Sequence, residues 1–343
     1  MDVSPLNYKL IFEPDLKKFT FAGLESISIN CKKPVNTITM NCAELKIKSC
    51  TVKSGKKIIK SFPKTNEKKE ELQIKLAEKI RGLCTVDLEF EGILNDRLLG
   101  FYRSRYEQNG KTKYLATTQF EAADARRAFP CWDEPEAKAT FEISIIADNQ
   151  FTAISNMPVK TKKKTGKTTL YNFQKTPLVS TYLIYLGVGE FEYLSGKAGK
   201  IQIRVVTTKG NTSKGKFSLE LGKKLLTSYE KYFGIKFPLP KLDLIAVPDF
   251  AAGAMENWGA ITFRETILLY DPKTSSTRTK QFIAEVISHE IAHMWFGNLV
   301  TMKWWNDLWL NESFATFMAT KFVDKFYPEW DLWNQFVEDA MNV

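Results

Sequence analysis

Short stretches in which apolar and polar residues alternate fill the first 193 positions of this chain, and they constrain its fold more than any other feature. Examples are "FAGLESISIN" (21–30), "LCTVDLEFEG" (83–92) and "TFEISIIAD" (140–148), which Gly, Lys, Asn and Pro residues separate. Alternation turns one face of a strand toward a core and the other toward solvent. Because no long helical period interrupts this region, we predict an antiparallel β domain over residues 1–193.

Helical patterns follow this region. Apolar residues recur at helical spacing over 217–229, and Gly234 then provides a stop signal. Two further helices are predicted near the end of the chain, over about 279–296 and about 307–326.

Two strand-like stretches lie between the predicted helices. "KLDLIAV" (241–247) and "ITFRETILLY" (261–270) flank the loop "PDFAAGAMENWGA" (248–260). Strands mixed with helices in this way are typical of an α+β arrangement. We therefore expect a second domain over residues 194–343.

The chain contains only two histidines, and they lie four residues apart in "HEIAH". On a helix this spacing brings the imidazoles of His289 and His293 to one face, with Glu290 beside them. Two such nitrogen ligands can occupy two positions of a tetrahedral zinc ion, and the glutamate can act on a water. The alternative is a helix that carries two histidines by chance, so a third ligand is needed to decide.

Glu312 is the candidate third ligand. We expect Gly297 to end the first helix and Asp307 to cap the next, so that Glu312 lies in the first turn of that second helix. An ordinary surface carboxylate would also suit a first turn. Its sequence neighbours are apolar, however, and an unpaired carboxylate among them would be costly; they are Trp309, Leu310, Phe314 and Phe317. Three protein ligands and one open position favour a catalytic zinc site with one Zn²⁺ per chain.

Charge and composition narrow the classes of function. The net charge is +10, and scattered lysine clusters such as 53–60 and 160–167 supply much of it. We expect these clusters at solvated hairpin turns, because no arginine-rich aromatic face or nucleic-acid-binding module appears. No uninterrupted apolar run is long enough to span a membrane. The sequence therefore predicts neither a nucleic-acid partner nor a membrane partner.

Cysteine usage indicates the compartment. The five cysteines include no C-x-x-C pair, which argues against a disulfide framework and against a thiolate zinc site. The first residues, "MDVSPLNYKLIFEPDL", lack a basic start followed by an apolar stretch, so we expect no secretory signal. Both observations favour a cytoplasmic location.

These motifs together resemble a known family. H-E-x-x-H with a downstream glutamate, preceded by "GAMENWGA" (253–260), is similar to the zinc aminopeptidases related to aminopeptidase N and the puromycin-sensitive enzyme, which are gluzincins. "WLNESFATFM" (309–318) is particularly similar to the tricorn-interacting aminopeptidases. The first domain is also similar to this family, at residues 100–106, 117–141 and 179–191. The resemblance therefore covers essentially the whole chain.

The resemblance implies a fold and a set of catalytic roles. Residues up to about 193 would form the N-terminal β domain, and 194–343 the first part of a thermolysin-like α+β zinc-peptidase domain that is incomplete at its C-terminus. His289, His293 and Glu312 would bind zinc. Glu290 would act as general base toward the attacking water and then pass the proton to the leaving amine.

An aminopeptidase must also recognise the free N-terminus of a peptide. Carboxylates or amide oxygens near the metal suit the positive α-ammonium group, and the resemblance assigns this role to Glu256, helped by Gln119, with Glu121 close by. Gly253 would let a peptide backbone approach and pair as an extra strand. We expect the side chain of Met255 to serve packing. The expected substrate-binding segment as a whole is Gly253, Ala254, Met255, Glu256 and Asn257.

One departure from the family pattern matters. The family places a tyrosine well beyond the third zinc ligand, where its hydroxyl stabilises the oxyanion. The last tyrosine here, Tyr327, comes too early and precedes Pro328. Loss of such a donor typically costs about 10²- to 10³-fold in turnover. The final residues, 331–343, predict a helix with an uncovered apolar face, and a second chain carrying the missing C-terminal half is an expected partner.

Several readings of the function stay open. The favoured one is a zinc aminopeptidase that releases N-terminal amino acids from peptides and is incomplete as this chain. A zinc-binding but catalytically weak protein that captures peptide N-termini is the main alternative. A basic nucleic-acid-binding protein with an incidental motif is disfavoured, as is an epoxide-hydrolysing relative, because G-A-M-E-N with alanine second resembles the peptidases more.

Overall fold

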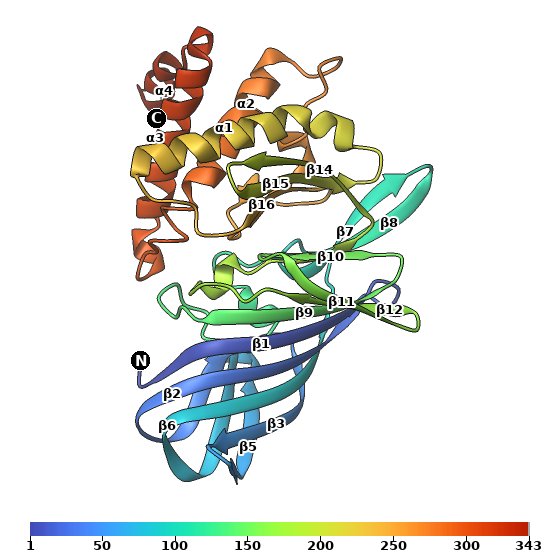
Figure 1. The fold of residues 1–343 in the computed structure, drawn as a ribbon. Coiled ribbons are helices and arrows are strands. Elements are labelled where there is room, and N and C mark those ends of the chain that lie inside the picture. The colour runs from blue at the N-terminus through green and yellow to red at the C-terminus, as the bar shows by residue number, and fades with distance from the viewer. Residues whose placement is uncertain (342–343) are drawn as a thin grey trace. The chain divides into compact units, whose positions relative to one another are not determined.

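The computed structural model describes residues 1–341, which form two compact units (Figure 1). The first unit is Met1–Glu190, and the second begins at Phe191. Strand β14 (Phe191–Ala198) opens the second unit, so the domain boundary expected after residue 193 falls inside a strand.

Strands dominate the first unit and form two sheets. The larger sheet has the order β11-β12-β9-β1-β2-β6-β3-β4, with β5 also paired to β6. Its strands are β1 (Val3–Asp15), β2 (Thr20–Asn41), β3 (Lys46–Ser54), β4 (Lys57–Ile59), β5 (Ser61–Asn66), β6 (Glu71–Ile93), β9 (Thr140–Asp148), β11 (Val159–Thr165) and β12 (Thr168–Phe173). The smaller sheet has the order β10-β13-β8-β7. It contains β7 (Gly100–Gln108), β8 (Lys111–Gln119), β10 (Thr152–Ser155) and β13 (Leu186–Gly189).

The predicted antiparallel arrangement holds for the strand pairs described in residues 1–190, with one exception. Strands β1 and β9 run parallel, from Asn7 opposite Thr140 to Phe12 opposite Ile145. A parallel pair needs a long crossover connection, which the chain between these two strands supplies. Alternation of apolar residues is the same in both kinds of pair, so the sequence pattern does not distinguish them.

The inward-facing residues of the long strands build the core of the first unit. On β2, Phe21 is 2% exposed, and Ile27 and Ile29 are fully buried. Aromatic rings fill much of the interior: Tyr8 and Phe141 stack with their centroids 4.8 Å apart. Burial of this apolar surface is the main force that stabilises the unit.

Glu25 occupies one of these inward positions. It lies on β2 opposite Leu10 of β1 and Leu88 of β6. The residue is 3% exposed, and neither carboxyl oxygen has a hydrogen-bond partner among the described residues. Removal from water therefore raises the pKa of Glu25 well above its ordinary value. Folding favours the neutral form of this carboxyl group.

As the pH rises from 5 to 8, the variant Glu25→Gln is expected to become more stable relative to the natural chain. Because folding raises the pKa of Glu25, its contribution to stability is complete below the ordinary glutamate pKa of about 4.3. That contribution is lost as the pH rises toward the folded-state pKa, by up to about 1.4 kcal/mol per pH unit. An amide does not ionise and lacks this loss. Urea unfolding at the two pH values tests the prediction, and an identical pH effect in both proteins would contradict it.

The lysine clusters lie in two different settings. Cluster 53–60 surrounds the expected hairpin turn, with Gly55 between β3 and β4. Cluster 160–167 does not: its first lysines lie along β11, the edge strand of the larger sheet, and only its end forms the turn at Gly166. Lysines on an edge strand oppose pairing with another chain, which explains a basic run inside a strand.

The second unit contains a five-stranded sheet of order β14-β15-β16-β18-β17. Its further strands are β15 (Ile201–Thr208), β16 (Lys241–Val247), β17 (Ala254–Met255) and β18 (Ala260–Arg264). β16 pairs in parallel with both β15 and β18. β18 is shorter than the strand expected over 261–270, because a 3₁₀ turn begins at Glu265.

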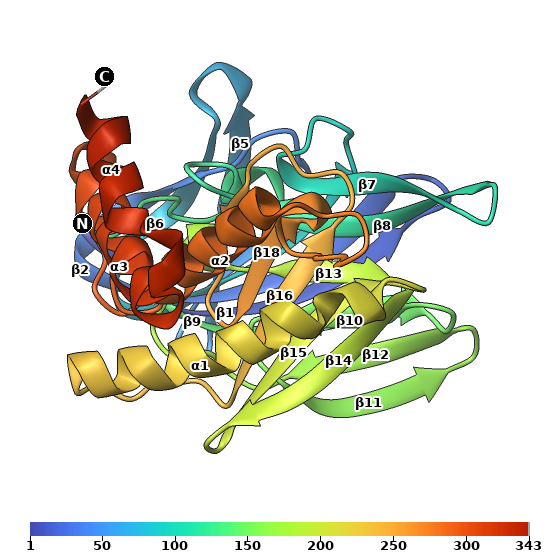
Figure 2. The same cartoon turned by 90° about the horizontal axis from the view of Figure 1, so that it is seen from above.

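Helix α1 (Lys216–Phe233) packs against β14 and β15 (Figure 2). Leu221, Leu225 and Tyr229 are buried, as the helical spacing predicts. Gly234 ends the helix with a φ of 68°, in the left-handed region that favours glycine. Among the described residues, no helix combines the length and the apolar content needed to cross a membrane.

Three helices follow the sheet: α2 (Thr277–Ala292), α3 (Trp309–Phe326) and α4 (Leu332–Met341). α2 packs against both α1 and α3, and α4 packs against α3. A helix therefore forms within the expected range 331–343, and residues 342 and 343 lie outside the described part of the chain.

Two predicted helix ends were wrong. α2 ends at Ala292 with His293 as its C-cap, before the expected end at Gly297. Asp307 is not the N-cap of α3. It is the last residue of a 3₁₀ turn, and the backbone between this turn and α3 is already helical. An N-cap needs extended backbone, which this continuous turn removes.

The ammonium group of Lys280, on α2, lies over four aromatic rings. Its Nζ atom is 5.0 Å from the ring centroid of Phe217 and 5.6 Å from that of Tyr270. Tyr327 and Trp330 stack at 4.1 Å and lie 5.9 and 6.0 Å from the same Nζ. Ring faces attract cations, so this cage stabilises the packing of α1, α2 and the end of α3.

The variant Lys280→Met is expected to lower the free energy of unfolding by about 1–2 kcal/mol, because it keeps the apolar side-chain contacts but removes the cation. Lys280→Arg keeps the charge and is expected to retain most of that stability. Thermal and urea unfolding of both variants measure the difference. A methionine variant as stable as the natural chain would show that the charge contributes nothing.

Candidate metal centre

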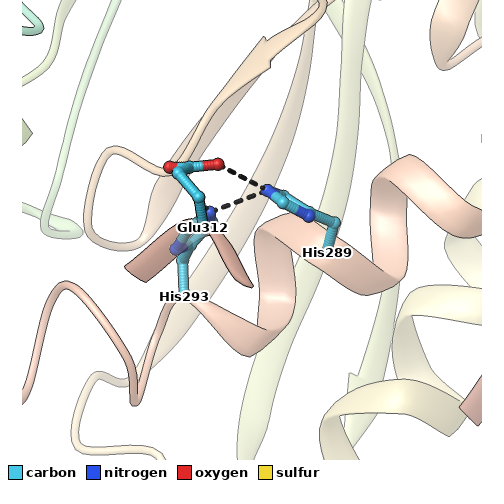
Figure 3. Close-up of side chains that lie close together, drawn as sticks. All are labelled: His289, His293 and Glu312. Carbon is cyan, nitrogen blue, oxygen red and sulfur yellow. Dashed lines mark hydrogen bonds and ion pairs between the residues drawn. The ribbon is translucent and has the colours of Figure 1, made fainter. Parts of the chain in front are cut away.

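His289 and His293 meet at the C-terminal end of α2. His293 is the C-cap, and its backbone N–H donates to the carbonyl oxygen of His289 at 3.2 Å. Both imidazoles leave the same side of the helix, and their Nε2 atoms are 2.9 Å apart (Figure 3). The H-E-x-x-H spacing therefore brings two nitrogen atoms to one point.

Glu312 brings a carboxylate to the same point from the first turn of α3 (Figure 3). Its Oε2 lies 3.3 Å from Nε2 of His289, and its Oε1 lies 3.6 Å from Nε2 of His293. Ligand atoms around a tetrahedral zinc, at bond lengths of about 2.0–2.1 Å, are about 3.3–3.4 Å from one another. The three separations of 2.9, 3.3 and 3.6 Å bracket that value, so these residues fit zinc. Within residues 1–341, no other group of three such side chains has ligand atoms this close together.

A backbone carbonyl fixes the tautomer of His293. Its Nδ1 lies 2.9 Å from the carbonyl oxygen of Phe296, which can only accept, so Nδ1 carries the hydrogen. Nε2 of the neutral ring then presents its lone pair to His289 and Glu312. Burial, followed by the charge of His289, lowers the pKa of His293 to about 4. The ring is therefore neutral near pH 7, which is the form that binds metals.

Glu312 lies on the open side of the cluster. Burial by itself would raise the pKa of Glu312, but the hydrogen bond with His289 and the charges of the two histidines outweigh it and lower that pKa. The side chain of Glu312 is 43% exposed, whereas that of His293 is 1% exposed. An ionised ligand beside solvent leaves room for water or substrate, as a catalytic centre requires.

Glu290 follows His289 on α2 and is only 6% exposed. Neighbouring helix positions differ by about 100° around the axis, so its carboxylate leaves α2 beside the face that carries the two histidines. Buried carboxylates next to a metal-binding cluster are typical general bases.

The expected substrate-binding segment, Gly253–Asn257, lies at the edge of the sheet in this unit. β17 is the terminal strand, pairs with β18 and contacts α2. Glu256 is 3% exposed, and the buried Asn257 donates from Nδ2 to Oγ1 of Thr262 at 3.1 Å. A Cβ added at Gly253 would meet a single heavy atom within 4 Å, at 3.7 Å, so the glycine leaves space beside β17.

Two family models match the chain. The model described as the peptidase M1 N-terminal domain matches residues 4–183, and the model described as the peptidase family M1 domain matches residues 217–343. The chain belongs to the peptidase M1 family. This membership confirms the predicted order of a mostly β N-terminal domain followed by the start of an α+β peptidase domain.

The M1 chain is also similar to curated proteins from plants, yeast and a nematode. It is 44% identical to "Aminopeptidase M1" of Arabidopsis thaliana over 98% of its own length. It is 44% identical to "Aminopeptidase 2, mitochondrial" of Saccharomyces cerevisiae over 99%, and 43% identical to "Puromycin-sensitive aminopeptidase" of Caenorhabditis elegans over 98%. The chain spans 39% of the Arabidopsis protein and 36% of each of the other two.

The remaining predicted site residues of the M1 chain belong to the first unit. Gln119 is the last residue of β8, pairs with Gly100 of β7 and is 9% exposed. Glu121 follows two residues later. The cluster of the two histidines and Glu312 lies wholly in the second unit, together with Glu256.

Sequence reasoning missed two groups that contact the imidazoles of the M1 chain. One is the carbonyl oxygen of Phe296, for which no residue type gives a signal, because it belongs to the backbone. The other is Thr316, whose Oγ1 lies 3.4 Å from Nδ1 of His289. Thr316 follows Glu312 by one helical turn on α3, so helical spacing could have indicated it.

Proposed function

We propose that this chain supplies the metal-binding part of a zinc-dependent aminopeptidase, which releases N-terminal amino acids from peptides. The main observation behind this proposal is that Nε2 of His289, Nε2 of His293 and the carboxylate of Glu312 come together at separations that suit zinc. The similar proteins of Arabidopsis, yeast and the nematode are all named as aminopeptidases, which supports the same activity.

In this proposal the residues of α2 and α3 bind the metal and transfer a proton. His289, His293 and Glu312 hold one zinc ion, which when bound polarises the scissile carbonyl and makes water more acidic. Glu290 accepts the proton of the attacking water and donates it to the leaving amine. Its burial supports this role, because a carboxylate shielded from solvent holds and returns a proton instead of exchanging it with bulk water.

In the same proposal Glu256 binds the N-terminus of the peptide, and Gln119 and Glu121 are further proposed contacts. A carboxylate held in a buried position attracts an α-ammonium group more strongly than one in water. Gly253, Ala254, Met255 and Asn257 complete the proposed substrate-binding segment. β17 ends its sheet, so an extended peptide can pair with its outer edge.

A second candidate is a zinc-binding, catalytically weak protein that captures peptide N-termini. Tyr327 supports it, because the ring of this residue stacks on Trp330 and faces Lys280 and so has a packing role. The proposed partners are peptides with a free N-terminus and a second chain.

Hydrolysis of aminoacyl arylamides by the purified chain, with zinc content measured on the same sample, tests both candidates. Stoichiometric zinc with turnover supports the aminopeptidase proposal for the chain alone. Stoichiometric zinc with peptide binding but no turnover supports the second candidate. A chain that binds no zinc at pH 7 would overturn both.

We also propose a cytoplasmic location. The five cysteines of the chain are free thiols, and thiols stay reduced in that compartment. Fractionation of cells followed by immunodetection tests the proposal, and a signal confined to an organelle or to the medium would contradict it.

A further inference from the structure

Asn298 joins two parts of the proposed site. It lies in the turn after α2 and is fully buried. Its backbone N–H donates to the carbonyl oxygen of His293 at 3.0 Å. Its side-chain Nδ2 donates to the carbonyl oxygen of Glu256 at 2.8 Å. One residue thus bonds the backbone of a proposed metal ligand to the backbone of the proposed amine-binding residue.

The turn that carries Asn298 is tightly held. The N–H of Gly297 donates to the carbonyl oxygen of Val300 at 2.7 Å, and the N–H of Val300 donates to that of Trp295 at 3.1 Å. Gly297 has a φ of 124°, a conformation that favours glycine. A Cβ there would come within 3.1 Å of Nδ2 of Asn311. The side chain of Asn298 therefore donates its hydrogen bond from a turn whose backbone is held in place.

Other side chains fix the ends of the loop that carries Glu256. Nε of Arg264 donates to the carbonyl oxygen of Phe250 at 3.0 Å, before the segment. Nζ of Lys241 donates to the carbonyl oxygen of Gly259 at 2.7 Å, after it. Both bonds tie the loop to the sheet. The bond from Asn298 instead ties the middle of the loop, at Glu256, to the metal-binding segment.

We propose that Asn298 is a positioning residue that sets the separation between the metal ligands and Glu256. The inference rests on the proposed function, in which Glu256 binds the α-ammonium group and zinc the adjacent carbonyl. One Cα atom separates those two groups in every peptide, so the site must hold one fixed spacing. A misplacement of about 1 Å can cost on the order of 100-fold. Asn298 fits this task because its side chain bonds the backbone carbonyl of Glu256 and not the carboxyl group.

Two probes that differ only in the α-amino group test the proposal: alanine hydroxamate and propionohydroxamate. Both are expected to ligate zinc through the hydroxamate, and their intrinsic difference as ligands is the same for every variant. The change of the affinity ratio from one variant to another therefore measures recognition of the amine. The ratio is determined by calorimetry on the zinc-loaded chain for the natural sequence, Asn298→Asp, Asn298→Ser and Glu256→Gln. Asn298→Asp keeps the shape but removes the donor, and Asn298→Ser covers the case in which the aspartate variant does not fold. Zinc affinity is measured for each by competition with a chelator.

Asn156→Asp is the matched control. Asn156 is a buried asparagine of the first unit whose Nδ2 also donates to a backbone carbonyl, that of Leu183, at 2.8 Å. The same chemical change there is expected to leave the affinity ratio unchanged, whatever it does to stability.

We expect the natural chain to prefer alanine hydroxamate and the Asn298 variants to lower that preference by about tenfold, with zinc affinity and propionohydroxamate affinity within about twofold. An unchanged preference in the Asn298 variants, with loss of preference in Glu256→Gln, would overturn the inference and keep the proposed function. An unchanged preference in Glu256→Gln would refute the proposed role of Glu256 itself. Equal losses for both probes, or loss of zinc, would show a purely structural role and also overturn the inference.

Discussion

Replacement of His293 with alanine is expected to weaken zinc binding by more than about 100-fold, since even the outer partners of metal ligands contribute 10- to 100-fold. His293 is the most buried of the three proposed ligands, and Phe296 already holds its ring in the tautomer that suits a metal. Its loss leaves two ligands on a site that needs three. Zinc affinity, measured by competition with a chromophoric chelator, tests the prediction.

The controls for this variant separate loss of metal from loss of fold. Thr316→Val removes only the hydroxyl group beside His289, so its expected effect on zinc affinity is smaller than that of His293→Ala. Far-ultraviolet circular dichroism of the metal-free proteins should be the same in all cases. If His293→Ala binds zinc as tightly as the natural chain, the metal lies elsewhere.

The variant Glu290→Gln is expected to keep its zinc and to lower kcat by about 10²- to 10⁴-fold, the usual contribution of a general base. Glutamine has nearly the size and shape of glutamate, so the buried position on α2 stays filled. The amide cannot accept the proton of the attacking water. KM is expected to change little, because Glu290 has no proposed part in binding the peptide.

Arylamide hydrolysis and zinc content, both measured on one preparation, test the role of Glu290. Glu256→Gln is the matched comparison, because it makes the same chemical change at another buried glutamate of the unit. It is expected to raise KM instead. Unchanged turnover in Glu290→Gln would exclude a general base at this position, and loss of zinc would indicate a metal ligand.

The part of the candidate site that lies on α2 could be predicted, because helical periodicity determines it. The spacing of His289 and His293 places both rings on one face of any helix. The apolar sequence neighbours of Glu312 were a wrong guide to its surroundings, because Trp309, Phe314 and Phe317 are exposed and the side chain of Glu312 is itself 43% exposed. The three side chains meet because α2 packs against α3. The spacing of the residues in the sequence led us to expect this tertiary contact but could not establish it. Asn298 could not be predicted, since its two partners are backbone carbonyls far apart in sequence.

The fold shows the same division. Alternation predicted the β character of the first unit, but not the parallel pairing of β1 with β9, which depends on where the crossover returns. Alternation also assigns Glu25 an inward position, between Gly23 and Ile27, against the preference of a charge for water. The early end of α2 at Ala292 follows from the hydrogen bonds of the turn near Gly297, which no local propensity reveals.

In the proposed zinc site, the position of His293 at the C-cap would couple metal occupancy to local unfolding. His289 belongs to the helix, whereas His293 is its C-cap, at the junction between the helix and the following turn. A ligand that bridges both binds only while that junction is closed, so it shifts the local opening equilibrium by mass action. Amide hydrogen exchange at residues 293–300 would then slow on addition of zinc more than exchange in the middle of α2. The end of a helix would thus act as a thermodynamic sensor of the metal.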